Sequence, residues 1–309
     1  MIQVEERYIS LLTDFGFKRI FGTAINKDLL ICFLNSLFDG KQVVKDVSYL
    51  NPEHVGDVYT DRKAIFDVYC EGENGEKFIV EMQNAYQTYF KDRSLFYSTF
   101  PIREQAPKGD DWDFKLNHVY TVALLNFSMN DDAFDKEKIR HHVQLCDTAT
   151  HKVFYDKLEF IYVEIAKFDK KLDELQTLYE KWLYALKNLY KLSQRPKELC
   201  DKVFDRLFEE AEIAKFSPLE MREYEASKKA YRDIKNSVDT AKRQGIAEGM
   251  KQGMEKGMKQ GMKQGMKQGM EQRSLEIARK MLAKGMDAAS VMEITGLSAE
   301  QMQQLKAEF

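Results

Sequence analysis

The chain has few cysteines, few prolines and no long uncharged apolar run. Of its 309 residues only 4 are Cys and 5 are Pro. The cysteines lie dozens of residues apart without metal-site or redox spacing, so free buried thiols in a reducing compartment are expected. No stretch of about 18 uncharged apolar residues occurs, and charged residues interrupt the opening segment too early for a signal peptide. We therefore expect a soluble, cytoplasmic protein with no membrane role.

An excess of positive charge is also absent. The chain has 47 Lys and Arg against 50 Asp and Glu, a net charge of -3. This balance excludes the general basic field of many nucleic-acid-binding proteins, so any such role must come from a local site. A hydrophobic fraction of 44% and an aromatic fraction of 12% indicate a folded globular protein.

The first half of the chain predicts the order helix, three strands, helix, strand. Helical spacing of apolar residues covers 17–38, with a break near Gly22 and with Asp14 and Asn26 as plausible caps. A second helix, interrupted by Pro101, is expected at 89–105. Runs rich in β-branched and aromatic residues predict the four strands of this order at 43–50, 62–71, 77–83 and 117–127. One more strand is expected at 158–168.

The second half is mainly helical and contains a strict repeat. From Gly245 to Met270 the sequence has a four-residue period of Gly, Met, Lys and Gln. Residues 241–270 have seven Lys or Arg against two Glu, so this segment alone is basic. We expect a core domain, a helical extension, the repeat, and a module of three short helices in the last part: 1–168, 169–240, 241–270 and 271–309.

The most informative pair of residues lies in the hairpin of the second and third strands. A two-residue turn at Asn74-Gly75 would place Asp67 opposite Met82, with Glu81 pointing away. A three-residue loop at 73–75 with Gly75 in the left-handed conformation instead places Asp67 opposite Glu81. We predict the second register.

Two facing carboxylates in apolar strands repel each other unless a cation or a shared proton neutralises them. A divalent metal fits, because hard oxygen ligands in small number suit Mg²⁺ or Mn²⁺. Such an ion can activate water for attack on a phosphodiester. Taken alone, an Asp and a Glu in neighbouring strands are more often ordinary surface residues.

These elements and motifs resemble the PD-(D/E)XK nuclease superfamily, an α/β fold with an αβββαβ core, a mixed sheet flanked by helices, and here an α-helical C-terminal extension. More closely, residues 8–168 resemble the Rpn group of recombination-promoting nucleases, also classed as PD-(D/E)XK family transposases. The resemblance is carried by these segments: TDFGFKRIFG with Asp14 and Lys18, Leu50-x-Pro52, IFDVYC, FIVEMQ, RSLFYS with Arg93 and Tyr97, Lys108-Gly109, and VYTVALLNF.

The resemblance implies a Mg²⁺-dependent DNA endonuclease, with Mn²⁺ as an alternative ion. It implies that Asp67, Glu81 and the carbonyl group of Met82 bind the metal. Gln83 stands where the wider superfamily has Lys, although Glu-X-Gln is usual in the Rpn group. Lys18 is a candidate for the missing positive charge.

Several residues near this candidate site keep more than one interpretation. Asp14 is a candidate metal ligand, a helix cap, or an i,i+4 partner of Lys18. Arg93 and Tyr97, one helical turn apart, either meet a DNA phosphate or pack on the sheet with Arg93 paired to a carboxylate. Acidic residues at 51–61 fit a solvated loop, although Asp57 and Asp61 are close enough in sequence to join the metal site.

The repeat and the terminal module also have competing interpretations. A Gly in every tetrad costs helix stability and favours a linker, whereas the remaining residues are good helix formers, so we expect a marginal helix stabilised by self-association. The helix lengths in 271–309 fit a helix-turn-helix DNA reader, but the low charge of the module favours contact with protein.

The sequence thus predicts an endonuclease that acts on DNA as a homo-oligomer formed through its C-terminal helical region, in recombination or in mobile-element or phage-related processes. The alternatives are a transposase with strand-transfer activity and a catalytically inactive module that contacts DNA or protein.

Overall fold

The structure is a computed structural model that describes residues 6–54, 64–106, 113–129 and 133–307. Contacts within the chain divide it into two compact units, Met1–Val238 and Asp239–Phe309.

The first unit is built on a six-stranded mixed sheet with strand order β1-β4-β5-β6-β8-β7. Strand β4 pairs antiparallel with β5, β5 and β6 are parallel, β6 and β8 are parallel, and β7 pairs antiparallel with β8. The expected mixed sheet flanked by helices is confirmed.

The helices and strands of the chain up to the end of the long helix α6 are α1 Asp14–Phe21, α2 Lys27–Phe38, β1 Val47–Tyr49, β2 Glu53–His54, β3 Ala64–Ile65, β4 Val68–Gly72, β5 Lys77–Gln83, α3 Phe90–Glu104, β6 Val119–Leu125, β7 Arg140–Cys146, β8 Val153–Glu164, α4 Leu178–Asn188, α5 Lys202–Glu210 and α6 Pro218–Ala283, with short 3₁₀ turns between some of them.

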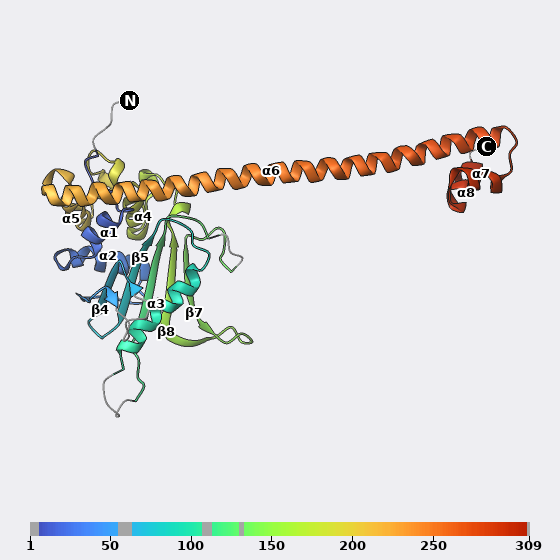
Figure 1. Ribbon diagram of the computed structural model, residues 1–309. Coiled ribbons are helices and arrows are strands. Elements are labelled where there is room, and N and C mark those ends of the chain that lie inside the picture. The colour runs from blue at the N-terminus through green and yellow to red at the C-terminus, as the bar shows by residue number, and fades with distance from the viewer. Residues whose placement is uncertain (1–5, 55–63, 107–112, 130–132, 308–309) are drawn as a thin grey trace. The chain divides into compact units, whose positions relative to one another are not determined.

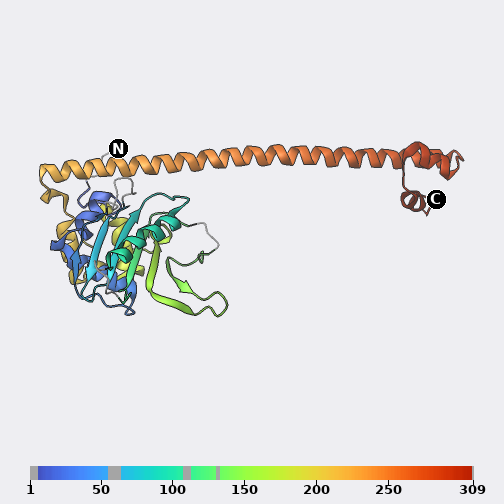
Figure 2. The ribbon, with the colours of Figure 1, turned by 60° about the horizontal axis from the view of Figure 1, so that its bottom comes forward.

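Helices cover both faces of this sheet. Figures 1 and 2 show α3 crossing one face, where Phe90 packs with Tyr162 and Phe100 packs with Ile79. The other face carries the main core, to which α1, α2, α4, α5 and the start of α6 all contribute buried residues. Because α3 connects the parallel strands β5 and β6, it must cross over the sheet. Residues on the α3 face of β5 therefore lie beneath that helix.

The N-terminal helices form as expected but with a different cap. The Thr13 hydroxyl accepts a hydrogen bond from the Gly16 N–H, so Thr13 caps α1 and Asp14 is its first residue. Asn26 precedes α2 without a side-chain capping bond, and its amide donates to the Arg19 carbonyl. The expectation of Asp14 and Asn26 as caps was wrong because both side chains have other partners.

No single helix among the described residues is long and apolar enough to cross a membrane. The bent pair formed by Asp14–Phe21 and Ala24–Phe38 reaches the required length and hydropathy only when both helices are combined. Many of its apolar residues are part of the main core of the first unit.

Three strand and helix predictions needed correction. The strand expected at 62–71 is broken at Phe66 and Asp67, because β3 pairs with β2 in a separate two-stranded sheet while β4 joins the main sheet. Pro101 does not interrupt α3, which continues to Glu104, so the proline costs the helix one backbone hydrogen bond without ending it. Strand β7 was not predicted, because most of its side chains are exposed and its sequence RHHVQLC lacks an apolar alternation.

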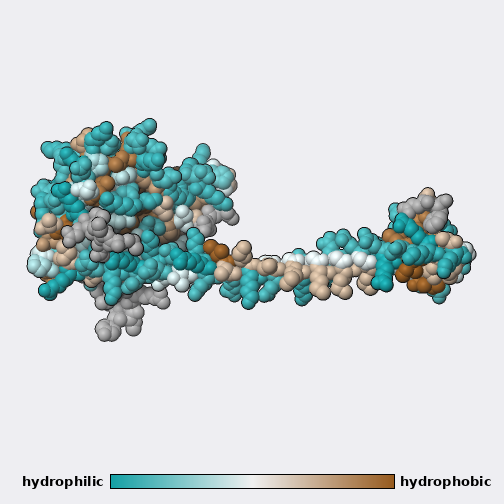
Figure 3. Space-filling model, turned by 90° about the horizontal axis from the view of Figure 1, so that it is seen from above, coloured by the Kyte–Doolittle hydropathy of each residue, from teal (hydrophilic) through white to brown (hydrophobic). Residues whose placement is uncertain are grey.

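The repeat forms part of the long helix α6, and the second unit ends in two short helices, α7 Ala288–Thr295 and α8 Ala299–Ala307. Asp287 caps α7 and Gly296 ends it with a positive φ of 69°. The expected cap at Ser298 is confirmed, since its hydroxyl accepts a hydrogen bond from the Gln301 N–H at 3.2 Å. A small core of the second unit joins the end of α6 to these helices. Figure 3 shows pale and light brown bands beside hydrophilic side chains along the repeat.

Candidate active site

The hairpin of β4 and β5 has the predicted three-residue loop. The Gly72 N–H donates to the Glu76 carbonyl at 2.8 Å, and Gly75 has the left-handed φ of 82°. In the ladder, Val68 pairs with Val80. Continuing this register by one residue places Asp67 opposite Glu81, as the sequence predicted.

Both carboxylates belong to the face of the sheet that α3 covers. Tyr69 and Ile79 lie in one cluster with Tyr97 of α3, and side chains two residues apart in a strand share a face. Asp67 and Glu81 are each two residues from a member of this cluster, although Asp67 lies in the bend just before β4. The Met82 N–H donates to Asp67 Oδ2 at 2.8 Å, which fixes the aspartate against β5.

Glu81 is buried with half of its carboxylate unsatisfied. Glu81 is 6% exposed, and its Oε2 accepts a hydrogen bond from Gln83 Nε2 at 3.1 Å. Its Oε1 is buried without a hydrogen-bond partner. Burial, followed by the charge of Asp67, raises the pKa of the Glu81 carboxyl. Such an atom is costly to bury unless a cation or a proton satisfies it.

Asp67 experiences opposing influences. Burial raises its pKa, while the hydrogen bond from Met82 and the charge of Lys18 act in the opposite direction without cancelling the rise. Two neighbouring carboxyls with raised pKa values show that the folded protein disfavours two negative charges here. This arrangement favours a bound cation.

Lys18 reaches the site from α1. Its Nζ lies 2.7 Å from Asp14 Oδ1 and 3.9 Å from Asp67 Oδ1. The interpretation of Asp14 as the i,i+4 partner of Lys18 is thus the one that the contacts support. Although burial opposes it, the hydrogen bond with Asp14 and the charges of Asp14, Asp67 and Glu81 raise the pKa of Lys18. Lys18 therefore supplies a positive charge next to the pair.

Arg93 and Tyr97 of α3 lie beside the same carboxylates. The Arg93 guanidinium carbon is 5.6 Å from the centre of the Tyr97 ring, and its Nη1 donates to Gln87 Oε1 at 2.6 Å. Its Nη2 is buried without a hydrogen-bond partner, and no carboxylate of the described residues forms an ion pair with it. Burial and the charge of Glu81 raise the pKa of Tyr97, whereas Arg93 lowers it. Arg93 thus has an unused donor near the carboxylates.

Protein atoms supply only part of the ligand set that a divalent cation such as Mg²⁺ needs. Within the described residues, no group of three or more His, Cys, Asp or Glu side chains is placed to hold a metal ion. The pair Asp67 and Glu81 supplies hard oxygen ligands, one of which is the unpartnered Glu81 Oε1. Mg²⁺ is commonly held by one or two carboxylates, with water and substrate phosphate as its other ligands.

Two asparagines at the site were not found by sequence reasoning. Asn84, which follows Gln83, donates from Nδ2 to the Leu12 carbonyl at 2.7 Å, and Asn126 Nδ2 donates to Asn84 Oδ1 at 3.3 Å and to the Tyr231 hydroxyl at 3.2 Å. They connect the ends of β5 and β6 to the segment before α1 and to α6. Their only signal in the sequence is that each polar amide directly follows a buried strand, β5 for Asn84 and β6 for Asn126.

Some predicted residues cannot be placed. Asp57 and Asp61, which were candidates for the metal site, lie outside the described residues, as do Lys108 and Gly109 of the motif series.

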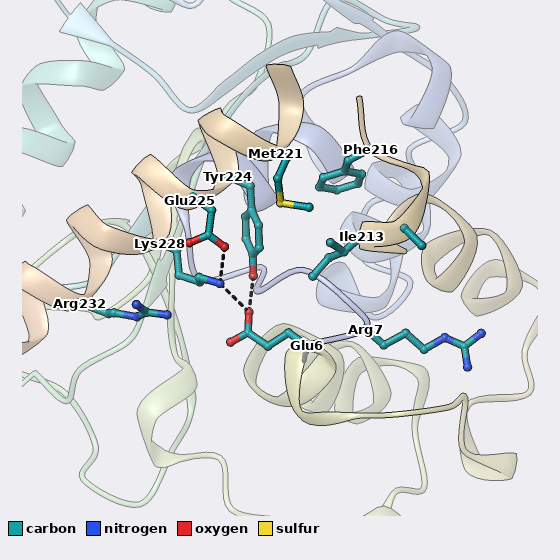
Figure 4. Close-up of a pocket in the computed structure, with 10 residues that line it drawn as sticks. Glu6, Arg7, Ile213, Phe216, Met221, Tyr224, Glu225, Lys228 and Arg232 are labelled. Carbon is teal, nitrogen blue, oxygen red and sulfur yellow. Dashed lines mark hydrogen bonds and ion pairs between the residues drawn. The ribbon is translucent and has the colours of Figure 1, made fainter. Parts of the chain in front are cut away.

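The cavity in Figure 4 is separate from the carboxylate pair. It has a volume of about 900 Å³ and lies between the segment at Glu6 and the first turns of α6. Lys228 is paired there with Glu6 at 3.2 Å and with Glu225 at 2.7 Å, and the Tyr224 hydroxyl donates to Glu6 at 3.1 Å. These mutual contacts join the N-terminal segment to α6 within the first unit.

An αβββαβ core with acidic residues on its second and third core strands defines the PD-(D/E)XK class of nucleases. Residues 11–241 match the family model described as PD-(D/E)XK nuclease family transposase, and the chain belongs to this family. Residues 271–307 match the C-terminal HTH domain of the Rpn/YhgA-like nuclease family. No curated protein and no solved structure matches the chain significantly. The second match favours the helix-turn-helix interpretation of the terminal module, which its low charge had disfavoured.

Proposed function

We propose that the chain is a divalent-metal-dependent endonuclease that hydrolyses DNA phosphodiester bonds. The main support is the facing pair Asp67 and Glu81, in which Glu81 Oε1 is buried without a partner. The unused Arg93 Nη2 supports it further, because the site then has unsatisfied groups of both signs. A metal ion and a phosphate satisfy the two together.

In this proposal Asp67, Glu81 and the Met82 carbonyl hold Mg²⁺ or Mn²⁺. When bound, the ion acidifies a water molecule and screens the negative charge of the phosphate. Gln83 donates one hydrogen bond to Glu81, which leaves its amide oxygen to orient a water. Because glutamine has no charge, Lys18 supplies the positive charge next to Asp67.

Arg93 and Tyr97 complete the proposed site as phosphate contacts. The guanidinium is held between the Phe90 and Tyr97 rings, with its carbon 5.2 Å and 5.6 Å from their centres. This fixed orientation suits a planar group that donates two hydrogen bonds to a phosphate. Asp14 is retained as a partner of Lys18, and a role for it as a metal ligand stays a prediction.

We infer that the terminal module contributes duplex binding. In a helix-turn-helix domain the second helix enters the major groove, and here that helix is α8. Gln303 and Gln304 are exposed on α8, and glutamine is suited to recognise adenine in that groove. We also propose a homo-oligomer formed through the C-terminal helical part, and a cytoplasmic location.

Nicking of a supercoiled plasmid tests the proposed activity. The wild type is expected to nick DNA with Mg²⁺ or Mn²⁺ and to lose this activity in EDTA. Asp67→Asn and Glu81→Gln should each reduce the rate by about a hundredfold or more. Glu71→Gln is the control, because Glu71 is in the same hairpin but paired with Lys77 at 2.6 Å. Nicking that persists in EDTA, or at an unchanged rate in Glu81→Gln, would contradict the proposal.

The name of the matching family favours strand transfer as a second candidate function. Hydrolysis and strand transfer share the same metal chemistry, so the site residues do not separate them. Incubating a labelled DNA end with an unlabelled plasmid distinguishes them, because only strand transfer yields a labelled joint molecule.

A further inference from the structure

Two large aromatic side chains are exposed on the segment that joins β5 to α3. Tyr86 is 56% exposed and Tyr89 is 74% exposed. Tyr86 touches Phe127 edge-on with ring centres 5.7 Å apart, and neither tyrosine belongs to a core cluster of the described residues. Packing of the fold therefore does not account for these rings, and they lie only a few residues after Glu81 in the chain.

The backbone that carries the two tyrosines is fixed by hydrogen bonds. The Phe90 N–H donates to the Gln87 carbonyl and the Arg93 N–H donates to the Tyr89 carbonyl, each at 3.0 Å. At the start of the segment, Asn84 is tied to Leu12 and Asn126. The tyrosines are thus presented from an ordered segment, so that a ligand contacting them meets preformed positions.

Tyr89 is aligned with the proposed phosphate contact. Tyr89, Arg93 and Tyr97 are spaced by four residues, and such positions lie on one side of a helix about 6 Å apart along its axis. Arg93 and Tyr97 lie next to the carboxylate pair: the charge of Arg93 lowers the pKa of Glu81, and the charge of Glu81 raises the pKa of Tyr97. A DNA strand with a phosphate at Arg93 therefore has a neighbouring nucleotide close to Tyr89.

Aromatic rings beside a backbone phosphate contact are suited to stack on nucleobases. Bases inside a duplex are already stacked on each other, so only unpaired bases offer a free face. We propose that Tyr86 and Tyr89 stack on unpaired bases next to the cleaved phosphate, so that the preferred substrate is DNA with a single-stranded segment at the cut. This inference rests on the nuclease function proposed above and specifies its substrate.

The inference is tested by DNA binding in EDTA, where no hydrolysis occurs. A fluorescent single strand and its duplex are titrated with the full-length wild type, Tyr86→Ala/Tyr89→Ala and Tyr86→Phe/Tyr89→Phe. The double alanine variant should lose about tenfold or more in affinity for the single strand and less than about twofold for the duplex. The phenylalanine variant retains the rings and should bind like the wild type.

Phe154→Ala is the matched control, because Phe154 is 80% exposed in β8 and lies far from Glu81 in the sequence. It should leave both affinities unchanged. Equal losses for single strand and duplex, or no loss in the alanine variant, would overturn the proposal. A change in oligomeric mass without a change in single-strand affinity would likewise overturn it and assign the tyrosines to protein contact.

Cleavage assays separate this inference from the function on which it rests. With Mg²⁺, the wild type should cut a substrate containing an unpaired segment faster than a full duplex, and the alanine variant should lose this preference. Equal rates on both substrates overturn the inference while the nuclease function stands. Tyrosine-dependent binding without any cleavage contradicts the nuclease function instead, and leaves the stacking contacts supported.

Discussion

At the scale of single residues, the site depends on a glutamate whose charge the fold disfavours. Glu81 combines burial, a nearby Asp67 and an unpartnered oxygen. Stabilising a protein does not require such a group, since an isosteric neutral side chain would avoid the cost. Its presence in the buried part of β5 is therefore better explained by binding than by folding.

Glu81→Gln should remove a pH-dependent cost from the metal-free protein. Burial and then Asp67 raise the pKa of Glu81 to about 8 from an ordinary value of 4.5. At pH values between these two pKa values the Glu81 carboxyl has lost its proton in the unfolded chain but keeps it in the folded chain. The free energy of unfolding of the wild type therefore falls as the pH rises through this window. In EDTA, calorimetry should show the variant more stable near pH 8, on the order of 1 kcal/mol or more, with the difference vanishing near pH 4.

Glu71→Gln is the control for this titration, because it removes a half-buried carboxylate that is paired with Lys77 in the same hairpin. Its melting temperature should follow the pH dependence of the wild type. If the Glu81→Gln and wild-type curves run parallel from acid to mildly alkaline pH, Glu81 does not titrate as its buried position implies.

Lys18 and position 83 should be interchangeable sources of positive charge. Lys18→Met removes the ammonium 3.9 Å from Asp67 and should reduce the cleavage rate by about ten- to a hundredfold. Adding Gln83→Lys to that variant places a charge where the wider superfamily has one and should restore part of the rate. Steady-state cleavage of one oligonucleotide measures both effects. A Lys18→Met variant with wild-type kinetics would show that this charge is not used.

At the scale of elements, the β4–β5 hairpin brings the two acids together. The apolar run in KFIVEMQ was sufficient to predict β5. The turn signal at Asn74-Gly75 allowed two registers, and the structure has the one that follows from a three-residue loop with Gly75 in the left-handed conformation. The break before β4 was not predictable, because the run at 62–71 looks continuous and its division depends on β3 pairing with β2. The approach of Lys18, Arg93 and Tyr97 depends on helix packing across the sheet, which the family resemblance suggested but local sequence patterns did not specify.

Gly75→Ala tests whether the loop conformation determines the site. Gly75 has a φ of 82°, which costs other residues about 1–2 kcal/mol, and an added Cβ would lie 2.5 Å from Asn117 Nδ2. Gly40→Ala is a matched control, since Gly40 has a φ of 78° but no neighbouring atom within 4 Å. Both variants should lose stability in thermal unfolding, Gly75→Ala more than Gly40→Ala because of the added contact with Asn117, but only Gly75→Ala should also weaken Mn²⁺ binding. Equal Mn²⁺ affinities in Gly75→Ala and Gly40→Ala would show that the conformation of the loop does not determine the metal site.

At the scale of the whole molecule, the repeat offers a surface for association. Its methionines are 60% to 77% exposed in α6: Met250, Met254, Met258, Met262, Met266 and Met270. A four-residue period advances about 40° around the helix per repeat, so a straight partner helix can follow the methionines for only a few repeats. This geometry favours a short crossing contact between two copies over an extended coiled coil.

Met258→Gln/Met262→Gln should weaken the proposed self-association while preserving the helix, because glutamine is a good helix former. Sedimentation at several concentrations should show a lower average mass for this variant than for the wild type. Gln260→Ala/Gln264→Ala is the control and should leave the mass unchanged. A wild type that sediments as a monomer at all concentrations would refute the proposed oligomer.

Calorimetric titration of Mn²⁺ into the full-length protein measures the proposed metal site at Asp67 and Glu81 directly, without requiring catalysis. We expect one site per chain in the wild type, a loss of affinity of about tenfold or more in Asp67→Asn and in Glu81→Gln, and no change in Glu71→Gln. Unaltered Mn²⁺ binding in both site variants, or no binding to the wild type, would contradict the proposal that this pair of carboxylates holds a metal ion.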